Sequence, residues 1–320
     1  MPTSVDVSIV VIAFNEQTTI EACVSALLAQ VTSRSFEVVV VDDGSTDRTA
    51  ELVDELSHRD PRVRMLAHER NRGRGAARRT GQDATHSSLV GYVDADVIVS
   101  ADWLERCATA LGAHGAVSGI AVPDGDCVVL VRLVHPSIRV RPHTMPISGG
   151  NVLFDAPALR AVGFDERARL GEDFRLARRM TELGYLIATV PGLVAEHRET
   201  KSYRSTMRWM WENGRDAARL PFEFRILRVP DVTWLVWVVV LVALVVLAGT
   251  GTLPWGLGVA GIVACTVVIA IGHAASRFRL RPRTMRWLAA AALDVPLVTM
   301  YLAGRTAGFP SAVRGARASR

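Results

Sequence analysis

The feature that most constrains the fold is the alternation of short apolar strands with amphipathic helices in the first third of the chain. β-Branched residues fill the first predicted strand, residues 7–14, and apolar residues recur at helical spacing over residues 18–30. The alternation continues through predicted strands 36–41, 63–67 and 89–93 and predicted helices 47–57 and 75–84. Strands joined by single helices require crossover connections. We therefore expect an α/β fold whose mostly parallel, Rossmann-like sheet is flanked by helices.

Polar residues follow these strands at the point where each one ends. They are Asn15-Glu16, Asp42-Asp43 and Asp94-Ala95-Asp96. Because ligands of open parallel sheets bind at the carboxyl ends of the strands, we expect these clusters to share one site. An Asp-x-Asp triplet after a buried strand offers carboxylate ligands of the type that Mg²⁺ and Mn²⁺ prefer. The triplet also occurs in solvated loops, so its place at a strand end carries the argument.

The rest of the first 200 residues is less periodic. A turn of small residues, Ser148-Gly149-Gly150-Asn151, precedes the apolar residues 152–154. Gly171-Glu172-Asp173 opens a predicted helix that ends near residue 183. A predicted strand at 185–190 is followed by Glu196-His197. We expect residues 1–200 to form one domain.

Five motifs occur in the order typical of one protein family. They are residues 10–16 (Val-Val-Ile-Ala-Phe-Asn-Glu), 40–47 (Val-Val-Asp-Asp-Gly-Ser-Thr-Asp), 71–78 (Asn-Arg-Gly-Arg-Gly-Ala-Ala-Arg), Asp94-Ala95-Asp96 and Gly171-Glu172-Asp173. With these motifs the chain resembles a family 2 glycosyltransferase of the GT-A fold from about residue 7 to residue 219. The resemblance implies an inverting, metal-dependent transfer of a sugar from a nucleotide-diphospho-sugar. We expect UDP as the nucleotide, with GDP or dTDP as alternatives.

The resemblance also implies roles for individual residues. Those expected to bind the nucleotide-sugar are Ala13, Phe14, Asn15, Glu16, Asp43, Gly73, Arg74, Arg78, Asp94, Gly149, Gly150 and Asn151. Asp96 is expected to coordinate Mg²⁺ or Mn²⁺, with Asp94 nearer the ribose or sugar and His197 as a further ligand. A lone histidine is more often structural, and Asp42-Asp43-Gly44-Ser45 also suits a turn with a helix cap.

The expected catalytic base is Asp173, which would take the proton from the acceptor hydroxyl. Glu172, beside it, is expected to bind the acceptor. Acids in the first turn of a helix also have a purely structural explanation, because the positive end of the helix dipole favours them. If the acceptor is itself a phosphate, no strong base is needed, and Asp173 would orient or repel the acceptor instead.

The segment after the first domain, residues 201–231, is predicted to contain an amphipathic helix over 203–220. One face carries Tyr203, Met207, Met210, Trp211 and Gly214, and arginines lie among the other positions. A basic helix of this kind fits a membrane surface, and it equally fits packing against the first domain.

Residues 232–320 are predicted to be a membrane domain. Uncharged stretches at 232–249 and 253–275 match the length of membrane spans and are joined by the uncharged linker Thr250-Gly251-Thr252, so we expect a helical hairpin. The arginines at 277, 279, 281, 283 and 286 place the following side, and with it the first domain, in the cytoplasm. Residues 287–304 contain Asp294 and Pro296 and are expected to be re-entrant or interfacial, with a third span as the alternative.

The cysteines and the charge agree with this placement. Cys23, Cys107, Cys127 and Cys265 form no Cys-x-x-Cys pair, which suits a reducing compartment. The net charge of +5 comes almost entirely from arginine. No basic domain or nucleic-acid-binding motif is found, so nucleic acid is not an expected partner. The N-terminal apolar run has no basic region before it and is predicted to be a strand, not a signal peptide.

Together these features predict a multi-pass enzyme of the cell membrane that faces the cytoplasm and takes part in cell-envelope glycan synthesis. The acceptor is expected to be a membrane lipid or a lipid-linked glycan. Ser205 replaces the glutamine of the Gln-x-x-Arg-Trp motif of processive synthases, which favours single transfers. Alternatives are a polyprenyl-monophospho-sugar synthase, a nucleotidyltransferase and a scaffold that binds nucleotide-sugars without catalysis. The sequence leaves the oligomeric state open.

Overall fold

The computed structural model describes residues 5–123, 147–168, 171–198, 203–225, 229–278 and 285–318. The chain divides into two compact units. The first comprises Met1–Gly125 and Ile138–Glu199, and the second comprises Asp126–Ser137 and Thr200–Arg320. Cys127 and the arginines at 279, 281 and 283 lie outside the described residues.

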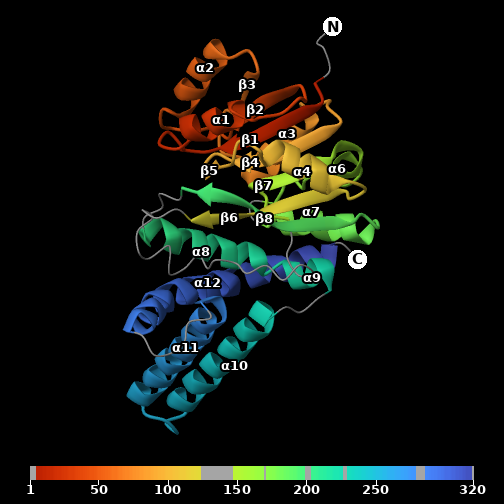
Figure 1. Ribbon diagram of the computed structural model, residues 1–320. Helices are drawn as coiled ribbons and strands as arrows, with labels where there is room; N and C mark the ends of the chain where they lie inside the picture. Colours follow the sequence, from red (N-terminus) through yellow and green to blue (C-terminus); the bar gives the residue numbers. More distant parts are fainter. Residues whose placement is uncertain are drawn as a thin grey trace. The chain divides into compact units, whose positions relative to one another are not determined.

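The first unit is built on one eight-stranded sheet in the order β3-β2-β1-β4-β7-β6-β8-β5 (Figure 1). The strands predicted from alternation are β1 (Val7–Ala13), β2 (Phe36–Asp42), β3 (Val63–Ala67) and β4 (Leu89–Asp94). The others are β5 (Val97–Ile98), β6 (Ala116–Pro123), β7 (Asn151–Asp155) and β8 (Ile187–His197).

The sheet is parallel in its first half and mixed in its second. β1 pairs in parallel with β2 and β4, and β2 with β3. β7 runs antiparallel to both β4 and β6, and β5 runs antiparallel to β8. β6 and β8 pair in parallel. The predicted parallel pairing is therefore confirmed for β1 to β4 and is found again between β6 and β8, while β5 and β7 run antiparallel to their neighbours. β8 also runs beyond residue 190 and includes His197, which the sequence prediction had placed after the strand.

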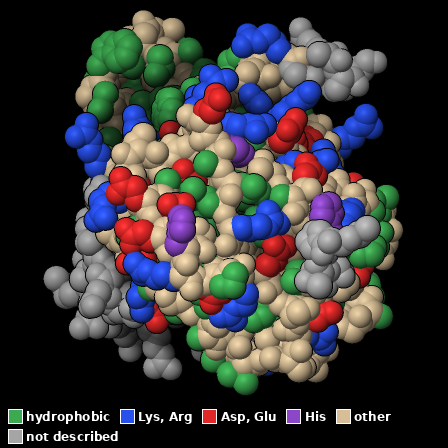
Figure 2. All heavy atoms as spheres, turned by 90° about the horizontal axis from the view of Figure 1, so that it is seen from above, with side chains coloured by type: hydrophobic (Ala, Val, Ile, Leu, Met, Phe, Trp, Pro, Cys, Tyr) green, Lys and Arg blue, Asp and Glu red, His purple; other side chains and the backbone are tan. Residues whose placement is uncertain are grey.

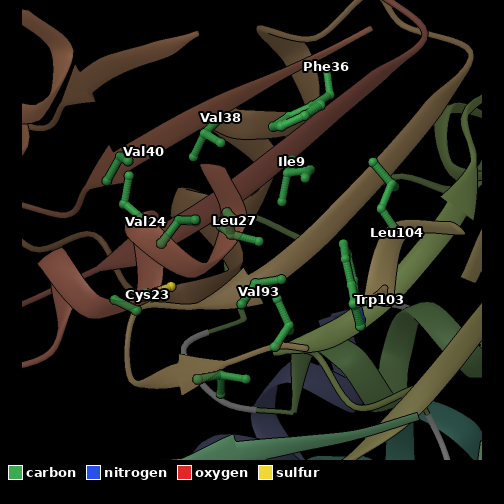
Figure 3. Close-up of a cluster of buried hydrophobic side chains, with 14 of the residues drawn as sticks. Ile9, Cys23, Val24, Leu27, Phe36, Val38, Val40, Val93, Trp103 and Leu104 are labelled. Atoms are coloured by element: carbon green, nitrogen blue, oxygen red, sulfur yellow. The ribbon is translucent and has the colours of Figure 1, made fainter. Parts of the chain in front are cut away.

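Helices cover both faces of this sheet. The core on one face joins β1 and β2 to α1 (Ile20–Leu28), α2 (Thr49–Arg59) and α4 (Trp103–Leu111), as Figure 3 shows for the side chains around Trp103 and Cys23. The core on the other face joins the sheet to α3 (Arg74–Asp83), α6 (Ala156–Val162) and α7 (Glu172–Glu182). Alternating residues of β2 point to opposite faces, with Val38 and Val40 in one core and Val39 and Val41 in the other. Burial on both faces explains why these strands are apolar throughout.

The second unit is helical. It contains α8 (Tyr203–Ala217), α9 (Leu220–Phe224), α10 (Val229–Gly249), α11 (Trp255–Phe278) and α12 (Met285–Ala318). α12 is one continuous helix through Pro296 and Pro310, so residues 287–304 do not turn back within the segment. Whether α12 lies in a membrane interface or crosses the membrane stays a prediction.

The amphipathic helix α8 packs along α12, a partner that neither sequence interpretation anticipated. Met210 of α8 is buried against Leu297. A Cβ on Gly214 would lie 2.1 Å from the Tyr301 carbonyl oxygen, and one on Gly304 would lie 2.1 Å from that of Trp211. The two backbones approach this closely because glycine stands at the crossing. The apolar face of α8 is therefore covered by protein, while arginines including Arg204, Arg208 and Arg215 remain exposed.

One helix of the described residues is long and apolar enough to cross a membrane. It is the stretch Asp231–Gly249 of α10, with a mean hydropathy of 2.8 and only 11% of its residues buried within the structure. The apolar part of α11, Trp255–Ala270, is shorter. The first predicted span thus coincides with a suitable helix, and the predicted hairpin of two spans is not confirmed.

The surface charges are mixed. Figure 2 shows acidic and basic side chains interspersed across one face of the molecule. On this face the excess of arginine is distributed among carboxylates rather than gathered into one block.

Candidate functional site

The loops after β1 and β2 are bound to each other at the carboxyl edge of the sheet. The Asn15 amide N–H donates to the Ser45 hydroxyl at 2.9 Å, and the Asn15 side-chain oxygen accepts from the Thr46 N–H at 2.8 Å. Asn15 has a φ of 59°, a conformation that asparagine tolerates better than most residues. Phe14, the residue before Asn15, is 42% exposed. The polar clusters expected to share a site therefore do meet at one edge.

Asp43 is buried and holds the next loop in place. One of its carboxylate oxygens lies 2.7 Å from His68 Nδ1 and accepts from the Arg72 N–H at 2.9 Å. The other accepts from the Gly73 N–H at 2.8 Å. His68 in turn lies 2.9 Å from the Thr80 hydroxyl on α3 through its second ring nitrogen. Asp43 thus fixes the turn that starts α3. Its carboxylate oxygens can accept further hydrogen bonds, so Asp43 could also bind a ligand.

Asp94 ends β4 and pairs with a buried arginine. The guanidinium of Arg78, which is 1% exposed, donates to Asp94 Oδ1 at 2.8 Å and also to the Gly149 carbonyl oxygen. A Cβ on Gly149 would lie 2.4 Å from Arg78 Nη1, and one on Gly150 would lie 2.5 Å from Asp94 Oδ2. Both glycines are needed because the chain passes directly over these side chains.

Arg78 lies behind the site instead of facing a ligand. Its Nε lies 3.2 Å from Glu172 Oε1, and its guanidinium lies 5.8 Å from the centre of the Phe164 ring. Burial acts to lower the pKa of Arg78, but the charges of Asp94 and Glu172 outweigh it and raise the pKa above its ordinary value. The side chain is therefore permanently charged, and its polar contacts in the described part of the chain are with protein groups. Binding of the nucleotide-sugar by Arg78 stays a prediction, and its 1% exposure leaves little of the side chain open to a ligand.

Glu172 and Asp173 form the first turn of α7 and differ in exposure. Glu172 is 3% exposed and faces Arg78, whereas Asp173 is partly exposed. Burial raises the pKa of Glu172, and the charge of Asp173 adds to this effect while Arg78 opposes it. Gly171 precedes them with a φ of 70°, which favours glycine. The structure therefore separates the pair into a buried residue bound to Arg78 and a residue accessible to solvent.

Arg74, the first residue of α3, is exposed, and four carboxylates of the site influence its pKa. Loss of hydration acts to lower the pKa of Arg74, but the nearby negative charges outweigh this effect and raise the pKa above its ordinary value. In order of their effect, these charges are Asp94, Glu172, Asp96 and Asp173. The guanidinium of Arg74 is thus a cation placed where a nucleoside diphosphate would bring further negative charge.

Asp96 and His197 form the pair best suited to a metal. Asp96 Oδ2 lies 3.0 Å from His197 Nε2, across the pairing of β5 with β8. Within the described residues there is no group of three or more metal-binding side chains. A carboxylate and an imidazole fit Mn²⁺ or Mg²⁺ when substrate phosphates supply the remaining ligands. Asp94 stands apart from this pair because Arg78 occupies one of its oxygens.

Asn151 was expected to bind the nucleotide-sugar, and the structure places it in the core. It is fully buried; its side-chain oxygen accepts from Trp103 Nε1 at 2.8 Å. Its amide donates to the carbonyl oxygens of Ile120 at 3.2 Å and Leu193 at 3.3 Å. Asn151 therefore joins parts of the sheet to α4, and its side-chain oxygen and nitrogen are both bonded to protein groups.

Sequence reasoning missed His68, Thr80 and Trp103. His68 follows β3 directly, and a polar residue at a strand end was the signal that identified the other clusters. Trp103 gave no such signal. Its indole N–H donates to Asn151, which is 48 residues away in the sequence and comes close only in the folded chain.

Comparisons with known proteins agree with this geometry. Residues 8–165 match the sequence model of Glycosyl transferase family 2. The succinoglycan biosynthesis protein ExoO of Rhizobium meliloti is 35% identical over 206 residues, which cover 58% of this chain and 58% of that protein. ExoU of the same organism is 31% identical over 199 residues, covering 54% and 56%. The matches thus span little more than half the length of these relatives.

A solved structure shares the fold. The mannosyltransferase PcManGT from Pyrobaculum calidifontis, in complex with GDP-Man and Mn²⁺, superimposes with a TM-score of 0.62 at 20% identity, covering 96% of this chain and 88% of that one. Residues 8–165 are therefore similar in sequence to Glycosyl transferase family 2, and the chain shares its mixed α/β fold with a solved mannosyltransferase.

Proposed function

We propose that this protein is a membrane-anchored, inverting glycosyltransferase that moves a sugar from a nucleotide-diphospho-sugar to an acceptor at the cytoplasmic membrane surface. The observation that carries the proposal is that Asp94 ends β4 at the carboxyl edge of the sheet and is joined through Arg78 to Glu172, the neighbour of Asp173 at the start of α7. Carboxylates and an exposed arginine, Arg74, suit a substrate that carries both hydroxyls and phosphates.

The chemistry follows from these positions. The acceptor oxygen attacks the anomeric carbon of the donor sugar from the side opposite the nucleotide. The bond between that carbon and the β-phosphate oxygen breaks, and the nucleoside diphosphate leaves with the electron pair. Asp173, partly exposed at the start of α7, receives the proton of the acceptor hydroxyl. Arg74 offers positive charge to the diphosphate, and Asp94 accepts hydrogen bonds from the ribose or the sugar.

A divalent metal is proposed as cofactor. Asp96 and His197 would hold it, and a divalent cation there would supply positive charge to offset that of the leaving diphosphate. PcManGT was solved with GDP-Man and Mn²⁺, which supports a nucleotide-sugar donor and a divalent metal here too. The donor base and sugar depend on a few pocket contacts, and UDP remains our expectation.

The membrane part of the proposal is supported by α10. Its stretch Asp231–Gly249 is long and apolar enough to span a membrane. We propose that it anchors the enzyme, and that the acceptor is a membrane lipid or a lipid-linked glycan. ExoO and ExoU are named for the biosynthesis of succinoglycan, which supports a role in glycan assembly. Anchoring by more than one span, with the first unit in the cytoplasm, stays a prediction.

The test is a donor screen on the full chain in lipid vesicles with Mg²⁺ or Mn²⁺. We expect one donor to give metal-dependent release of a nucleoside diphosphate together with a glycosylated lipid, both detected by mass spectrometry. Asp96→Ala and Asp173→Asn should abolish transfer. A glycosylated product with the sugar on a lipid monophosphate would select the polyprenyl-monophospho-sugar synthase, and release of pyrophosphate would select a nucleotidyltransferase. Tight nucleotide binding without turnover on any lipid, and wild-type function of both variants in cells, would select the scaffold.

A further inference from the structure

Arg78 connects two elements that are far apart in the sequence. Its Nη2 donates to Asp94 at the end of β4, and its Nε lies 3.2 Å from Glu172 at the start of α7. The third contact is with the carbonyl oxygen of Gly149 in the turn before β7. One guanidinium therefore joins a strand end, a turn and a helix start.

The slot around Arg78 allows little movement. The guanidinium lies 5.9 Å from the centre of the Tyr92 ring and 5.8 Å from that of Phe164. The Tyr92 hydroxyl donates to the Arg78 carbonyl oxygen at 2.9 Å. Aromatic rings and the backbone of Gly149 enclose the Arg78 side chain. A displacement of Asp94 or Glu172 therefore cannot be compensated by a movement of Arg78 into empty space.

Neither Arg78 nor Glu172 is exposed enough to meet a substrate. Arg78 is 1% exposed and Glu172 is 3% exposed. Asp173, the next residue along α7, is the one that reaches solvent. Consecutive residues of a helix point in different directions, so fixing Glu172 inward also fixes the direction of Asp173.

We propose that Arg78 and Glu172 are positioning residues: their buried ion pair holds the first turn of α7, and hence the Asp173 carboxylate, in a fixed relation to Asp94. This inference takes the roles of Asp94 and Asp173 from the proposed function. Asp94 touches the donor and Asp173 the acceptor, so the connection keeps the two substrates in register. A misplacement of about 1 Å between reacting groups can lower a rate by about 100-fold.

The test uses conservative variants of the full chain. Arg78→Lys keeps the charge, but its single ammonium cannot make the two hydrogen bonds and the ion pair of the guanidinium at once, and Glu172→Gln keeps the shape but removes the ion pair. Arg79→Lys is the matched control: Arg79 is the next residue on α3, is 43% exposed and pairs with Asp83. Thermal unfolding and nucleotide binding verify that each variant is folded.

The first measurement is hydrogen–deuterium exchange of the amides of residues 173–175, without substrate. We expect faster exchange in Arg78→Lys and Glu172→Gln and unchanged exchange in Arg79→Lys. Wild-type exchange in a folded Arg78→Lys or Glu172→Gln would overturn the connection. This result is independent of turnover, so it stands even if the donor screen finds no transferase activity and the proposed function fails.

The second measurement is steady-state kinetics on the donor found in the screen. We expect kcat to fall about 100-fold in Arg78→Lys and in Glu172→Gln, with the KM of the donor changed less than about threefold. The double variant should lose no more than the worse single variant, because both act through one contact. Unchanged kcat in either single variant, or losses that multiply in the double variant, would overturn the positioning role.

Discussion

The two most deeply buried arginines of the described residues lie in different units and have similar surroundings. Arg78 and Arg305 are each 1% exposed, and each guanidinium lies within 6 Å of two aromatic rings. In each, the Nε has no hydrogen-bond partner within the described part of the chain. They differ in their counter-charges: Arg78 faces two carboxylates, Asp94 and Glu172, whereas Arg305 pairs with Asp231 and donates to the Tyr301 hydroxyl at 3.0 Å.

The difference follows from what each site has to accommodate. The pair of Arg305 with Asp231 has no net charge. An unpaired ion beside an apolar helix would be costly, so a buried charge there needs a counter-ion. The group around Arg78 carries an excess negative charge, which a metal ion or Arg74 can offset at the open edge of the sheet. An ion pair without net charge can serve a purely structural role. A group with a net negative charge is suited to a site that binds further cations.

The largest expected effect is in the second unit. Asp231→Ala leaves Arg305 buried without a counter-ion and should lower the free energy of unfolding of this unit by about 3–5 kcal/mol. The measurement is thermal unfolding in detergent, followed by the helical circular dichroism signal. Arg208→Ala, which removes an exposed charge from α8, should change stability by less than about 0.5 kcal/mol.

A paired substitution tests the explanation. Asp231→Leu together with Arg305→Met replaces the ion pair by apolar side chains of similar size and should recover most of the stability. If the double variant unfolds as easily as Asp231→Ala, the ion pair contributes something other than charge balance, and the comparison with Arg78 fails.

A smaller loss is expected for Asp94→Ala in the first unit. Glu172 remains beside Arg78, so the variant loses hydrogen bonds to a charged group without leaving the cation unpaired, at a cost of about 1.5–3 kcal/mol. Because six of the seven tryptophans lie in the second unit, unfolding of the first unit is followed in denaturant by hydrogen–deuterium exchange of the amides of β1 and β2, and transfer activity should vanish. A loss as large as that of Asp231→Ala would show that Glu172 does not compensate.

The glycine contacts should give effects of about 1–3 kcal/mol in both units, because overpacking forces backbones apart. Gly304→Ala places a Cβ 2.1 Å from the Trp211 carbonyl oxygen, and Gly150→Ala places one 2.5 Å from Asp94 Oδ2. Only the second should also reduce transfer activity. The control is Gly256→Ala in α11, where a Cβ meets no atom within 4 Å of the described structure; it should leave stability unchanged or raise it slightly.

The smallest effect is expected from thiol labelling. Burial raises the pKa of Cys107 to about 12, and burial with the charges of Asp96 and Asp94 raises that of Cys23 still further. Iodoacetamide at pH 8 should therefore leave both unmodified in the folded protein, because the thiolate is the reactive form. Peptide mass spectrometry during denaturation should show both labelled together, at the unfolding of the first unit. Early labelling of Cys23 alone would mean that α1 opens separately.

The first half of the fold was predictable because its signals are local. The bounds of β3 agree with the prediction, and those of β1, β2 and α3 lie within two residues of it. β5 and β6 were missed: β5 has only two residues, and β6 gains its partners β7 and β8 from distant parts of the chain. The amphipathic pattern of α8 was also read correctly, but its partner α12 begins almost 70 residues later.

The sequence by itself determined the alternating strands, the place of the carboxylates at their ends, and the apolar stretch of α10, because each depends on neighbours along the chain. Only the tertiary structure decided which polar side chains face outward. Arg78, Asn151 and Glu172 are of residue types that bind substrates elsewhere, yet here they are buried against Asp94, Trp103 and Arg78 respectively. The physical reason is that burial depends on partners from distant segments, because a charged or amide group in the core needs counter-charges and hydrogen bonds that those segments supply.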